Sequence, residues 1–301
     1  MQEKLRIKNK KNIQRLALGT VQFGLDYGIA NQEGQASLAV ASDIINKASN
    51  AGLDTIDTAI GYGDSEEILG NIGIEKFKII SKLPALSSNS IKIQEWVDQQ
   101  IQASLSRLGV SRIYGFLLHH PEDLLSEFGN ELYDALLNLK QQSIVQKIGI
   151  SVYTPHEVDA ILNKFQIDLI QLPFNILDRR FLNQGYFKIF KDRGIEIHTR
   201  SAFLQGILLM PHDDIPKNFN KWNEIWKRWF SWQKETGCSA LQACLAYNMS
   251  VPEIDRVLVG VQSVDQMNQI LHSMSRLNIS EFPEFNNVSD ELINPSKWTS
   301  I

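Results

Sequence analysis

Four residues whose side chains can hold or move a proton lie in the first half of the sequence: Asp57, Tyr62, Lys82 and His119. A buried aspartate is costly unless a cation pairs with it, so Asp57 predicts a partner, and Lys82 is the natural one. A lysine cation lowers the pKa of an adjacent tyrosine, and a histidine can hydrogen-bond a carbonyl oxygen. Together the four would protonate an oxygen while hydride reaches the carbon, and hydride requires a cofactor.

Each of these residues also has a structural interpretation. An aspartate after a strand is often a turn residue, a tyrosine in a glycine loop often packs, and a histidine after an apolar strand is often structural. Placement on adjacent strand ends favours the chemical interpretation. Because neighbouring strand residues face opposite sides, only one of His119 and His120 can face the site, and we favour His119. Adjacent histidines lack the spacing of a zinc triad, so no metal is expected.

The local sequence around Asp57 and Tyr62 predicts how the two are positioned. Residues 53–59 read as a short apolar strand that carries the aspartate near its end. The glycines on either side of Tyr62 predict a sharp turn that displays the tyrosine on a loop. Ser65 is then expected to cap a helix whose first turn carries Glu66 and a second glutamate.

The rest of the chain alternates short apolar runs with longer amphipathic ones. Strands are predicted over residues 15–24, 53–59, 77–83, 112–120, 145–153, 168–175, 195–203 and 257–263. Eight strands, each followed by a helical pattern, predict an α/β fold, a (β/α)8 TIM barrel whose active site lies at the carboxyl ends of the strands. A doubly wound open sheet is the alternative, weakened because no GxGxxG follows the first strand.

Three helices are predicted most clearly. Residues 91–108 carry an apolar stripe along one face. Residues 154–157, Thr-Pro-His-Glu, read as a capping box with proline at the first helical position, and residues 263–266, Ser-Val-Asp-Gln, read as a second capping box.

The chain is expected to form one barrel domain over residues 13–279, with a basic N-terminal tail, 1–12, and a C-terminal tail, 280–301, packed over the barrel mouth. An excursion at 208–221 contains two prolines and is expected to be irregular. Phe282, Phe285 and Trp298 would anchor the C-terminal tail. Long loops of this kind usually form lids or substrate walls.

Composition excludes several kinds of partner. A net charge of −4 and a pI near 5.9 give no basic face for nucleic acid or membrane. The N-terminus lacks the apolar core of a signal peptide, and no window approaches the length of a membrane span, so a cytoplasmic protein is expected. Cys238 and Cys244 suit neither a CxxC centre nor a metal cluster and are read as reduced thiols. The oligomeric state is left open, because the four tryptophans between 222 and 232 could pack on the barrel or on a partner.

The motifs together resemble the aldo/keto reductase family. The resemblance runs from about residue 16 to 269, through LALGTVQFG, GLDTIDTAIGYGDSEEILG, SKLP, YGFLLHHP, KIGIS and IQLPFN. It implies a catalytic tetrad of Asp57, Tyr62, Lys82 and His119, in which Tyr62 is the general acid, the lysine and aspartate tune it, and the histidine positions the carbonyl. It also implies binding of NADP or NAD in extended form across the barrel mouth, with NADPH favoured.

The resemblance further implies which residues contact the cofactor. They follow the strand ends around the mouth: Gly19, Thr20, Val21, Asp57, Ser151, Gln171, Arg200, Ser201, Phe203, Gln205, Gly206, Gly260, Val261, Gln262, Ser263, Gln266 and Gln269. A helix N-terminus near residue 263 suits phosphate on general grounds as well.

Several positions depart from the family pattern. Val152 stands where an amide contact to nicotinamide is usual, and Arg200 where a stacking tyrosine is common, although a guanidinium can also stack. Gln266 replaces an arginine that often binds the 2′-phosphate, and Ile270 replaces an asparagine near adenine. These departures question the NADPH preference and could weaken cofactor binding.

The expected substrate is a small molecule with a carbonyl group. Polar residues of the 208–221 excursion favour a hydroxylated substrate, and the TVQFGLDYGIAN opening is similar to family members of surface-sugar pathways, so a sugar or nucleotide-sugar carbonyl is the hypothesis. Two alternatives stay open. Lys82 could form a Schiff base in a lyase, or the chain could be a regulatory homologue that binds cofactor without turnover.

Overall fold

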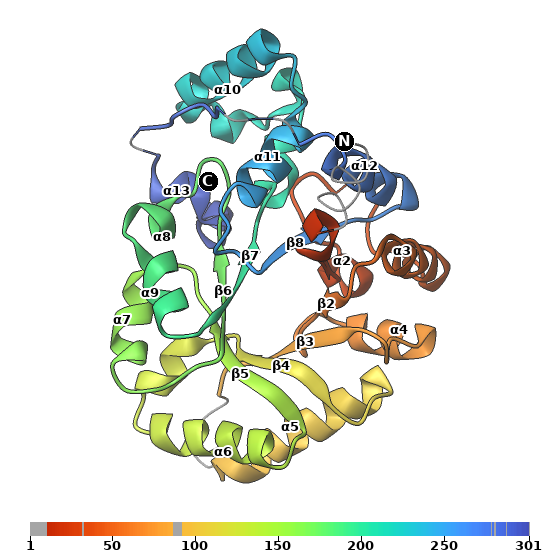
Figure 1. The fold of residues 1–301 in the computed structure, drawn as a ribbon, viewed down its shortest axis with the longest axis vertical. Coiled ribbons are helices and arrows are strands. Elements are labelled where there is room, and N and C mark those ends of the chain that lie inside the picture. The colour runs from red at the N-terminus through yellow and green to blue at the C-terminus, as the bar shows by residue number, and fades with distance from the viewer. Residues whose placement is uncertain are drawn as a thin grey trace.

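The computed structural model describes residues 11–31, 33–86, 92–277, 279, 281–286 and 288–300. Eight parallel strands close into a barrel in sequence order, which confirms the predicted fold (Figure 1). The strands are β1 (Leu16–Gly19), β2 (Thr55–Asp57), β3 (Lys78–Leu83), β4 (Ile113–Leu118), β5 (Val145–Ser151), β6 (Leu169–Pro173), β7 (Glu196–Arg200) and β8 (Arg256–Gly260).

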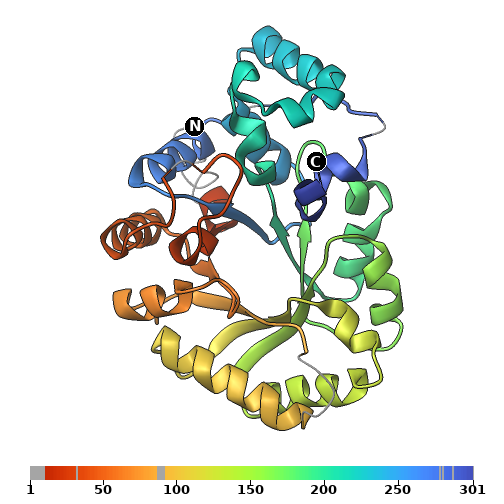
Figure 2. The ribbon, with the colours of Figure 1, turned by 180° about the vertical axis from the view of Figure 1, so that it is seen from behind.

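Helices surround the barrel in the views of Figures 1 and 2. The α-helices are α2 (Val21–Gly24), α3 (Leu38–Ala51), α4 (Ser65–Ile72), α5 (Ile93–Leu108), α6 (Gly129–Gln141), α7 (His156–Leu162), α8 (Arg180–Asn183), α9 (Tyr186–Asp192), α10 (Asn223–Thr236), α11 (Ala240–Met249), α12 (Val264–Met274) and α13 (Asp290–Ile293). The 3₁₀ turns are η1 (Pro121–Leu125), η2 (Leu204–Leu209), η3 (His212–Asp214), η4 (Lys217–Trp222) and η5 (Pro295–Ser300).

The strands bring distant parts of the sequence to one end of the barrel. Asp57 pairs with Gly19 on one side and Ile80 on the other, and Lys82 pairs with Leu117. Gly19, Asp57, Lys82 and Leu117 all lie at or near the carboxyl ends of their strands. Because the strands are parallel and closed, the loops that follow them share one face.

The first strand is shorter than predicted. It ends at Gly19, and residues 21–24, predicted as strand, form α2. The Thr20 hydroxyl donates to the carbonyl of Asp57 at 2.9 Å, which turns the chain here, and Phe23 is then buried in the core. The turn brings α2 against α4, next to the tyrosine loop.

Two predicted helix starts are wrong in detail. Helix α4 has Asp64, not Ser65, as its N-cap, because the buried Ser65 hydroxyl bonds instead with the carbonyl and hydroxyl oxygens of Thr20. In α7 the carboxylate of Glu157 accepts from the Tyr153 N–H at 2.9 Å and from the Thr154 hydroxyl at 2.8 Å. This is not the reciprocal box expected, because the glutamate reaches one residue further back.

The predicted cap at Ser263 is confirmed in part. Its hydroxyl oxygen accepts from the Gln266 N–H at 3.3 Å, but the Gln266 side chain accepts from Gln262 N–H at 2.9 Å rather than from Ser263. The 91–108 helix is confirmed from Ile93 onward, with Lys92 as N-cap. Residue 91 lies outside the described residues.

Glu66, in the first turn of α4, also connects this helix to two other elements. It is buried, and its carboxylate accepts from Ser81 on β3, from Ser104 on α5 and from the fork of Arg107. A buried carboxylate with several donors is stable, and this one joins α4, β3 and α5 next to Lys82.

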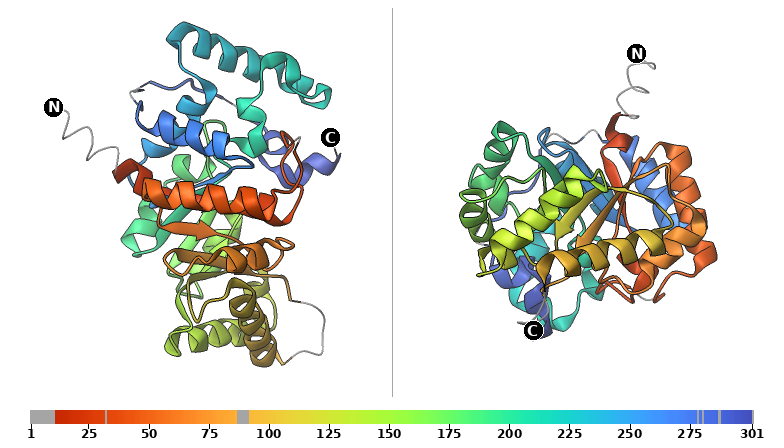
Figure 3. Two further views of the ribbon diagram at one scale, coloured as in Figure 1. Left: turned by 90° about the vertical axis from the view of Figure 1, so that its right-hand side faces the viewer. Right: turned by 90° about the horizontal axis from the view of Figure 1, so that it is seen from below.

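The excursion and the C-terminal segment lie together. Residues 208–221 form 3₁₀ turns rather than an α-helix, as the prolines predict. Phe219 packs edge-on against Trp298 at 4.9 Å, and Lys221 pairs with Glu291 at 2.8 Å. Figure 3 shows residues 11–14 and the α13–η5 segment at opposite ends of the barrel, so the C-terminal segment lies on the side where the strands end.

Both cysteines are free, Cys244 buried and Cys238 half-buried. Trp226 and Trp229 of α10 are buried, and their indole N–H groups donate to the Phe219 and Leu208 carbonyls, which joins α10 to the excursion. Residues 1–10 of the predicted N-terminal tail lie outside the described residues.

Candidate active site

A cavity of about 540 Å³ opens at the carboxyl ends of the strands. Its wall includes Asp57, Tyr62 and His119, and it extends past β7 to β8 and α12. This volume lies in the usual range for small-molecule and cofactor sites. Three members of the predicted tetrad therefore share one cavity.

Lys82 lies directly behind this wall and is fully buried. Its Nζ donates to Asp57 Oδ1 at 2.7 Å and to the Thr58 carbonyl at 2.8 Å, and lies 3.5 Å from the Tyr62 hydroxyl. Burial by itself would lower the pKa of Lys82, but the Asp57 carboxylate and the Tyr62 hydroxyl together outweigh it, and the pKa is raised. The lysine is therefore a fixed cation pointing at the tyrosine.

Tyr62 stands on a loop pinned by two glycines. A Cβ at Gly24 would lie 1.7 Å from the Tyr62 carbonyl oxygen, and one at Gly63 would lie 2.4 Å from the Gly24 oxygen. Gly63 also has φ +52°, a backbone conformation that glycine adopts without strain. This close backbone contact fixes the position of the phenol.

The prediction that Lys82 lowers the pKa of Tyr62 is wrong in the direction of the net shift. Burial raises the pKa of Tyr62, and the nearby Lys82 cation lowers it only in part, so the net shift is upward. Sequence reasoning included the lysine but not the desolvation. Tyr62 is thus a protonated donor at neutral pH.

His119, not His120, faces the cavity. Its ring lies 5.9 Å from that of Tyr62, edge to face, whereas His120 is exposed and lies near Glu122. Burial, together with the cations of Lys82 and Arg200, lowers the pKa of His119 to about 3. A neutral imidazole can donate one hydrogen bond to a carbonyl oxygen but does not supply a proton near pH 7.

Asp57 is held from two sides. Its second oxygen accepts from Gln171 Nε2 at 2.7 Å, while Lys82 takes the first. Gln171 also lines the cavity. Since its N–H₂ group is directed to Asp57, its amide oxygen is the group available to a bound molecule.

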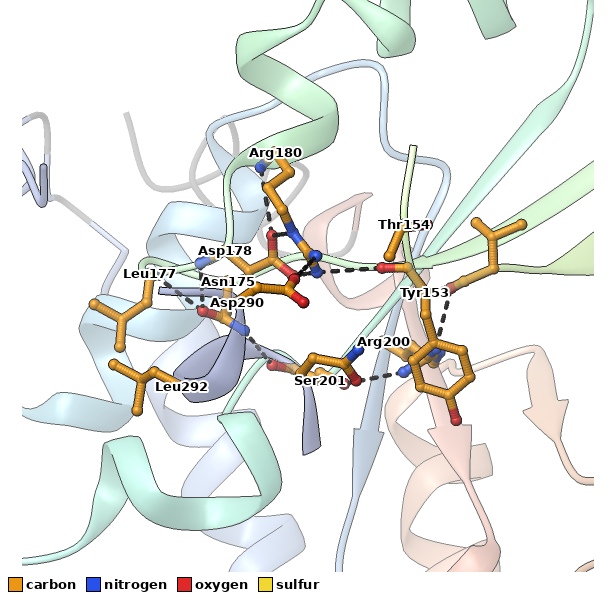
Figure 4. Close-up of polar contacts among 12 residues, drawn as sticks. Tyr153, Thr154, Asn175, Leu177, Asp178, Arg180, Arg200, Ser201, Asp290 and Leu292 are labelled. Carbon is orange, nitrogen blue, oxygen red and sulfur yellow. Dashed lines mark hydrogen bonds and ion pairs between the residues drawn. The ribbon is translucent and has the colours of Figure 1, made fainter. Parts of the chain in front are cut away.

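The wall between β5 and β7 is formed by Tyr153 and Arg200 (Figure 4). The guanidinium carbon of Arg200 lies 4.2 Å from the centre of the Tyr153 ring, and Nη2 donates to the Val152 carbonyl at 3.0 Å. The arginine therefore already stacks on an aromatic ring of the protein. Ser201 follows with φ +61°, a strained backbone conformation that often occurs at functional sites.

Beyond Arg200 two loops meet over the cavity. Gln205 Nε2 donates to the Tyr27 hydroxyl at 3.3 Å. Gly206 has φ +93°, and a Cβ there would lie 2.4 Å from Ala30 Cβ. The loop after β1 and the loop after β7 are therefore in contact, with only glycine tolerated at the crossing.

The far end of the cavity is neutral. The side chains that β8, α12 and their connection contribute to the lining are apolar or amide groups: Leu258, Val261, Gln262, Gln266, Gln269 and Ile270. Gln22 lines the cavity beside Gly260, and its buried Oε1 lacks a hydrogen-bond partner within the part of the chain that the structure describes. An unpaired buried acceptor is costly, so this atom is suited to a donor group of a ligand.

Most residues expected at the cofactor line this cavity, but two do not. Ser151 is buried outside the lining, and Ser263 is engaged as the cap of α12. Sequence reasoning missed Gln22, Tyr27 and Tyr153. Tyr27 lies in the segment TVQFGLDYGIAN, and Tyr153 directly follows Val152. An aromatic residue beside an expected cofactor contact is the signal that could have predicted both.

Within the described ranges, no group of three or more His, Cys, Asp or Glu side chains could hold a metal ion. No described helix is long and apolar enough to cross a membrane.

The family match covers nearly all of this structure. The sequence profile described as "Aldo/keto reductase family" matches residues 15–290. The chain belongs to the aldo/keto reductase family. This match confirms the resemblance drawn from the motifs. The chain is therefore an enzyme of the aldo/keto reductase family, and that family uses NAD(P)H.

Individual relatives are distant but cover most of the chain. The "NADH-specific methylglyoxal reductase" of Escherichia coli is 24% identical over 89% of this chain and 92% of its own. The human "Aflatoxin B1 aldehyde reductase member 4" is 24% identical over 87% and 90%. A solved aldo-keto reductase of Bacillus halodurans, in its holo form, matches with a TM-score of 0.69 at 18% identity, over 89% of this chain and 88% of that one. At this identity the structural likeness supports the fold alone.

Proposed function

We propose that this aldo/keto reductase reduces a small aldehyde or ketone with NADH, using Tyr62 as the general acid. The observation that carries the proposal is the Tyr62 hydroxyl at the cavity wall with a fixed Lys82 cation 3.5 Å behind it. When bound, the nicotinamide would supply hydride to the carbonyl carbon.

Each of the four side chains has its own role in protonating the carbonyl oxygen. Tyr62 donates its phenolic proton to the oxygen, and the negative charge left on the phenolate is stabilised by Lys82. Asp57 keeps the lysine in place and balances its charge. His119, neutral because of its lowered pKa, orients the oxygen by a hydrogen bond.

The extent of the cavity supports binding of an extended dinucleotide. It runs continuously from the tetrad to α12, and its lining includes the Gln171 amide near one end and the orphaned Gln22 oxygen at the β8 side. Residues proposed to hold the cofactor are the lining positions after β1, β7 and β8, together with Asp57, Gln171 and Arg200. The start of α12 borders this end of the cavity, and a helix N-terminus favours phosphate on general grounds.

The neutral far end supports NADH over NADPH. A 2′-phosphate would need cations, but none of the lining residues that β8 and α12 contribute within the described ranges is charged. Gln266, which stands where an arginine is common, is already bonded to Gln262, and the first turn of α12 carries Asp265. The E. coli relative's printed name, which specifies NADH, points the same way.

A small carbonyl compound suits the mouth better than a sugar. The sugar hypothesis combined the similarity of the TVQFGLDYGIAN opening with the polar residues of the excursion. Of these, the polar residues between His212 and Asn218 do not line the cavity, whereas the apolar Leu209 and Met210 do. One relative is named as a reductase of methylglyoxal, a short 2-oxoaldehyde, and another as a reductase of aflatoxin B1 aldehyde. We therefore propose a short aldehyde or 2-oxoaldehyde as substrate class.

The lyase alternative is disfavoured by Lys82 itself. Its three N–H groups face three oxygen atoms, its pKa is raised, and it does not line the cavity. A Schiff-base lysine must be neutral and reach the substrate.

The test is a titration of the purified protein with NADH and with NADPH, followed by quenching of its six tryptophans. We expect micromolar binding of NADH and at least tenfold weaker binding of NADPH, followed by oxidation of NADH when methylglyoxal or another short aldehyde is added. Equal affinities would contradict the cofactor preference. Binding without turnover across a carbonyl screen would favour the regulatory alternative.

A further inference from the structure

Arg180 joins the C-terminal segment to the wall of the cavity, although it does not line the cavity. Its Nε and Nη2 donate to the two oxygens of Asp178 at 2.8 and 2.7 Å, and Nη1 donates to Asp290 at the start of α13. The same Nη2 also donates to the backbone carbonyl of Tyr153 at 3.2 Å. Figure 4 shows the guanidinium between the two aspartates, directed to this carbonyl.

Tyr153 is thus held at both ends of its backbone. Glu157 accepts from its N–H at 2.9 Å, and Arg180 donates to its carbonyl. Its ring packs on the guanidinium of Arg200 at 4.2 Å, and both side chains line the cavity. A stacked cation over an aromatic ring depends on the relative position of the two groups, so a shift of Tyr153 would move Arg200.

The backbone that follows Arg200 is also held by residues near Asp178. Asn175, fully buried, donates to the carbonyl of the strained Ser201 at 3.0 Å and accepts from the Asp178 N–H at 2.9 Å. The loop that carries Asp178 therefore supports both Arg180 and the segment after Arg200. Strain at a single residue persists only where surrounding contacts hold it.

We propose that Arg180 is a positioning residue for cofactor binding: held between Asp178 and Asp290 of the C-terminal segment, it fixes Tyr153 and, through it, Arg200. The inference rests on the proposed function, since it assumes that the cofactor binds beside Arg200. The C-terminal segment then contributes to cofactor affinity without contacting the cofactor.

The experiment compares Arg180→Met with Arg179→Met by tryptophan-quenching titration with NADH. Arg179 is the matched control, because it also anchors the C-terminal segment, through the Pro283 carbonyl at 2.7 Å and the Tyr247 ring. Arg180→Met is expected to raise the Kd for NADH about tenfold, and Arg179→Met less than twofold. At saturating NADH, kcat should stay within about twofold in both, so the effect falls on the cofactor KM.

Two further variants separate positioning from general destabilisation. Asp290→Asn removes the pair on the segment's side and should raise the Kd about threefold, while Glu291→Gln, which removes the Lys221 pair of the same helix, should not. In an Arg200→Met background, Arg180→Met should change the Kd less than twofold, since both changes act through one contact.

An unchanged Kd in Arg180→Met, or additive effects of the two arginine substitutions, would overturn the inference and leave the proposed function intact. Failure of the unsubstituted protein to bind NADH would instead remove the proposed function. If Arg180→Met does not fold, Asp290→Asn and Arg180→Lys carry the same comparison, and wild-type affinity in both would reject the inference.

Discussion

The two ends of the barrel hold the same four kinds of side chain in different arrangements. At the carboxyl ends of the strands lies the carboxyl-end cluster: Asp57, Tyr62, Lys82 and His119. At the amino ends lies the amino-end cluster: Tyr114, Lys147, Glu196 and His198. Each contains a tyrosine, a lysine, a carboxylate and a histidine, so residue type alone does not distinguish them.

The two clusters differ in which groups donate hydrogen bonds to their carboxylate. In the amino-end cluster Glu196 accepts from the tyrosine hydroxyl at 2.6 Å, from Lys147 and from His198 at 2.8 Å, so every donor points inward to one acceptor. In the carboxyl-end cluster the carboxylate takes the lysine and a glutamine, and the Tyr62 hydroxyl faces a cavity. A closed network supports structure, and an open one leaves a donor for a substrate.

The largest expected difference between the clusters is in turnover. Tyr62→Phe removes the proton donor and should lower kcat at least about 10³-fold, while the Kd for NADH stays within about twofold. Tyr114→Phe, the matched change in the amino-end cluster, should leave kcat within about twofold. Steady-state kinetics and cofactor titration of both variants give the result, and substantial turnover by Tyr62→Phe would reject its role as general acid.

The lysines are expected to differ in what they contribute to stability. Lys82→Met leaves the buried Asp57 with Gln171 as its one side-chain donor among the described residues, which should lower the free energy of unfolding by about 3–5 kcal/mol. Lys147→Met leaves Glu196 two donors and should cost about 1–3 kcal/mol, with activity unchanged. Urea denaturation measures both, and equal losses would contradict the ranking.

The smallest expected effects are in the pH dependence of stability. The pKa of His119 is lowered from 6.5 to about 3, so the unfolded chain binds the proton first and stability falls as pH drops from 6.5 towards 3. His119→Asn should flatten this slope between pH 6.5 and 4.5.

The carboxylate of the amino-end cluster, Glu196, affects stability in a lower pH range than His119 does. Despite its burial, bonds from His198 and Lys147 lower the pKa of Glu196 below 4.5, so its stabilising contribution is present above pH 4.5 and is lost below it. The stability difference between wild type and Glu196→Gln should therefore shrink as pH falls below 4.5. Urea midpoints at several pH values test both windows, and the same slope for all three proteins would contradict this assignment.

Short-range patterns were sufficient for the fold. Eight apolar runs separated by amphipathic segments predict the barrel, because strand and helix periodicities are local. The errors lie at element ends. The local pattern predicts strand through residues 21–24 and predicts Ser65 as a helix cap, and both predictions are wrong. The observed structure at both places depends on bonds of Thr20 to Asp57 and Ser65, which are distant from it in sequence.

What the sequence by itself determined is the barrel, the order of its strands and the chemical types gathered at their carboxyl ends, since a parallel closed sheet brings consecutive strand ends together. Only the tertiary structure decided that Tyr62 has a raised pKa, that Gln171 supports Asp57, and that Arg180 connects the C-terminal segment to Arg200. Desolvation and hydrogen bonds between residues far apart in the chain set these properties, and neither is encoded in a local pattern.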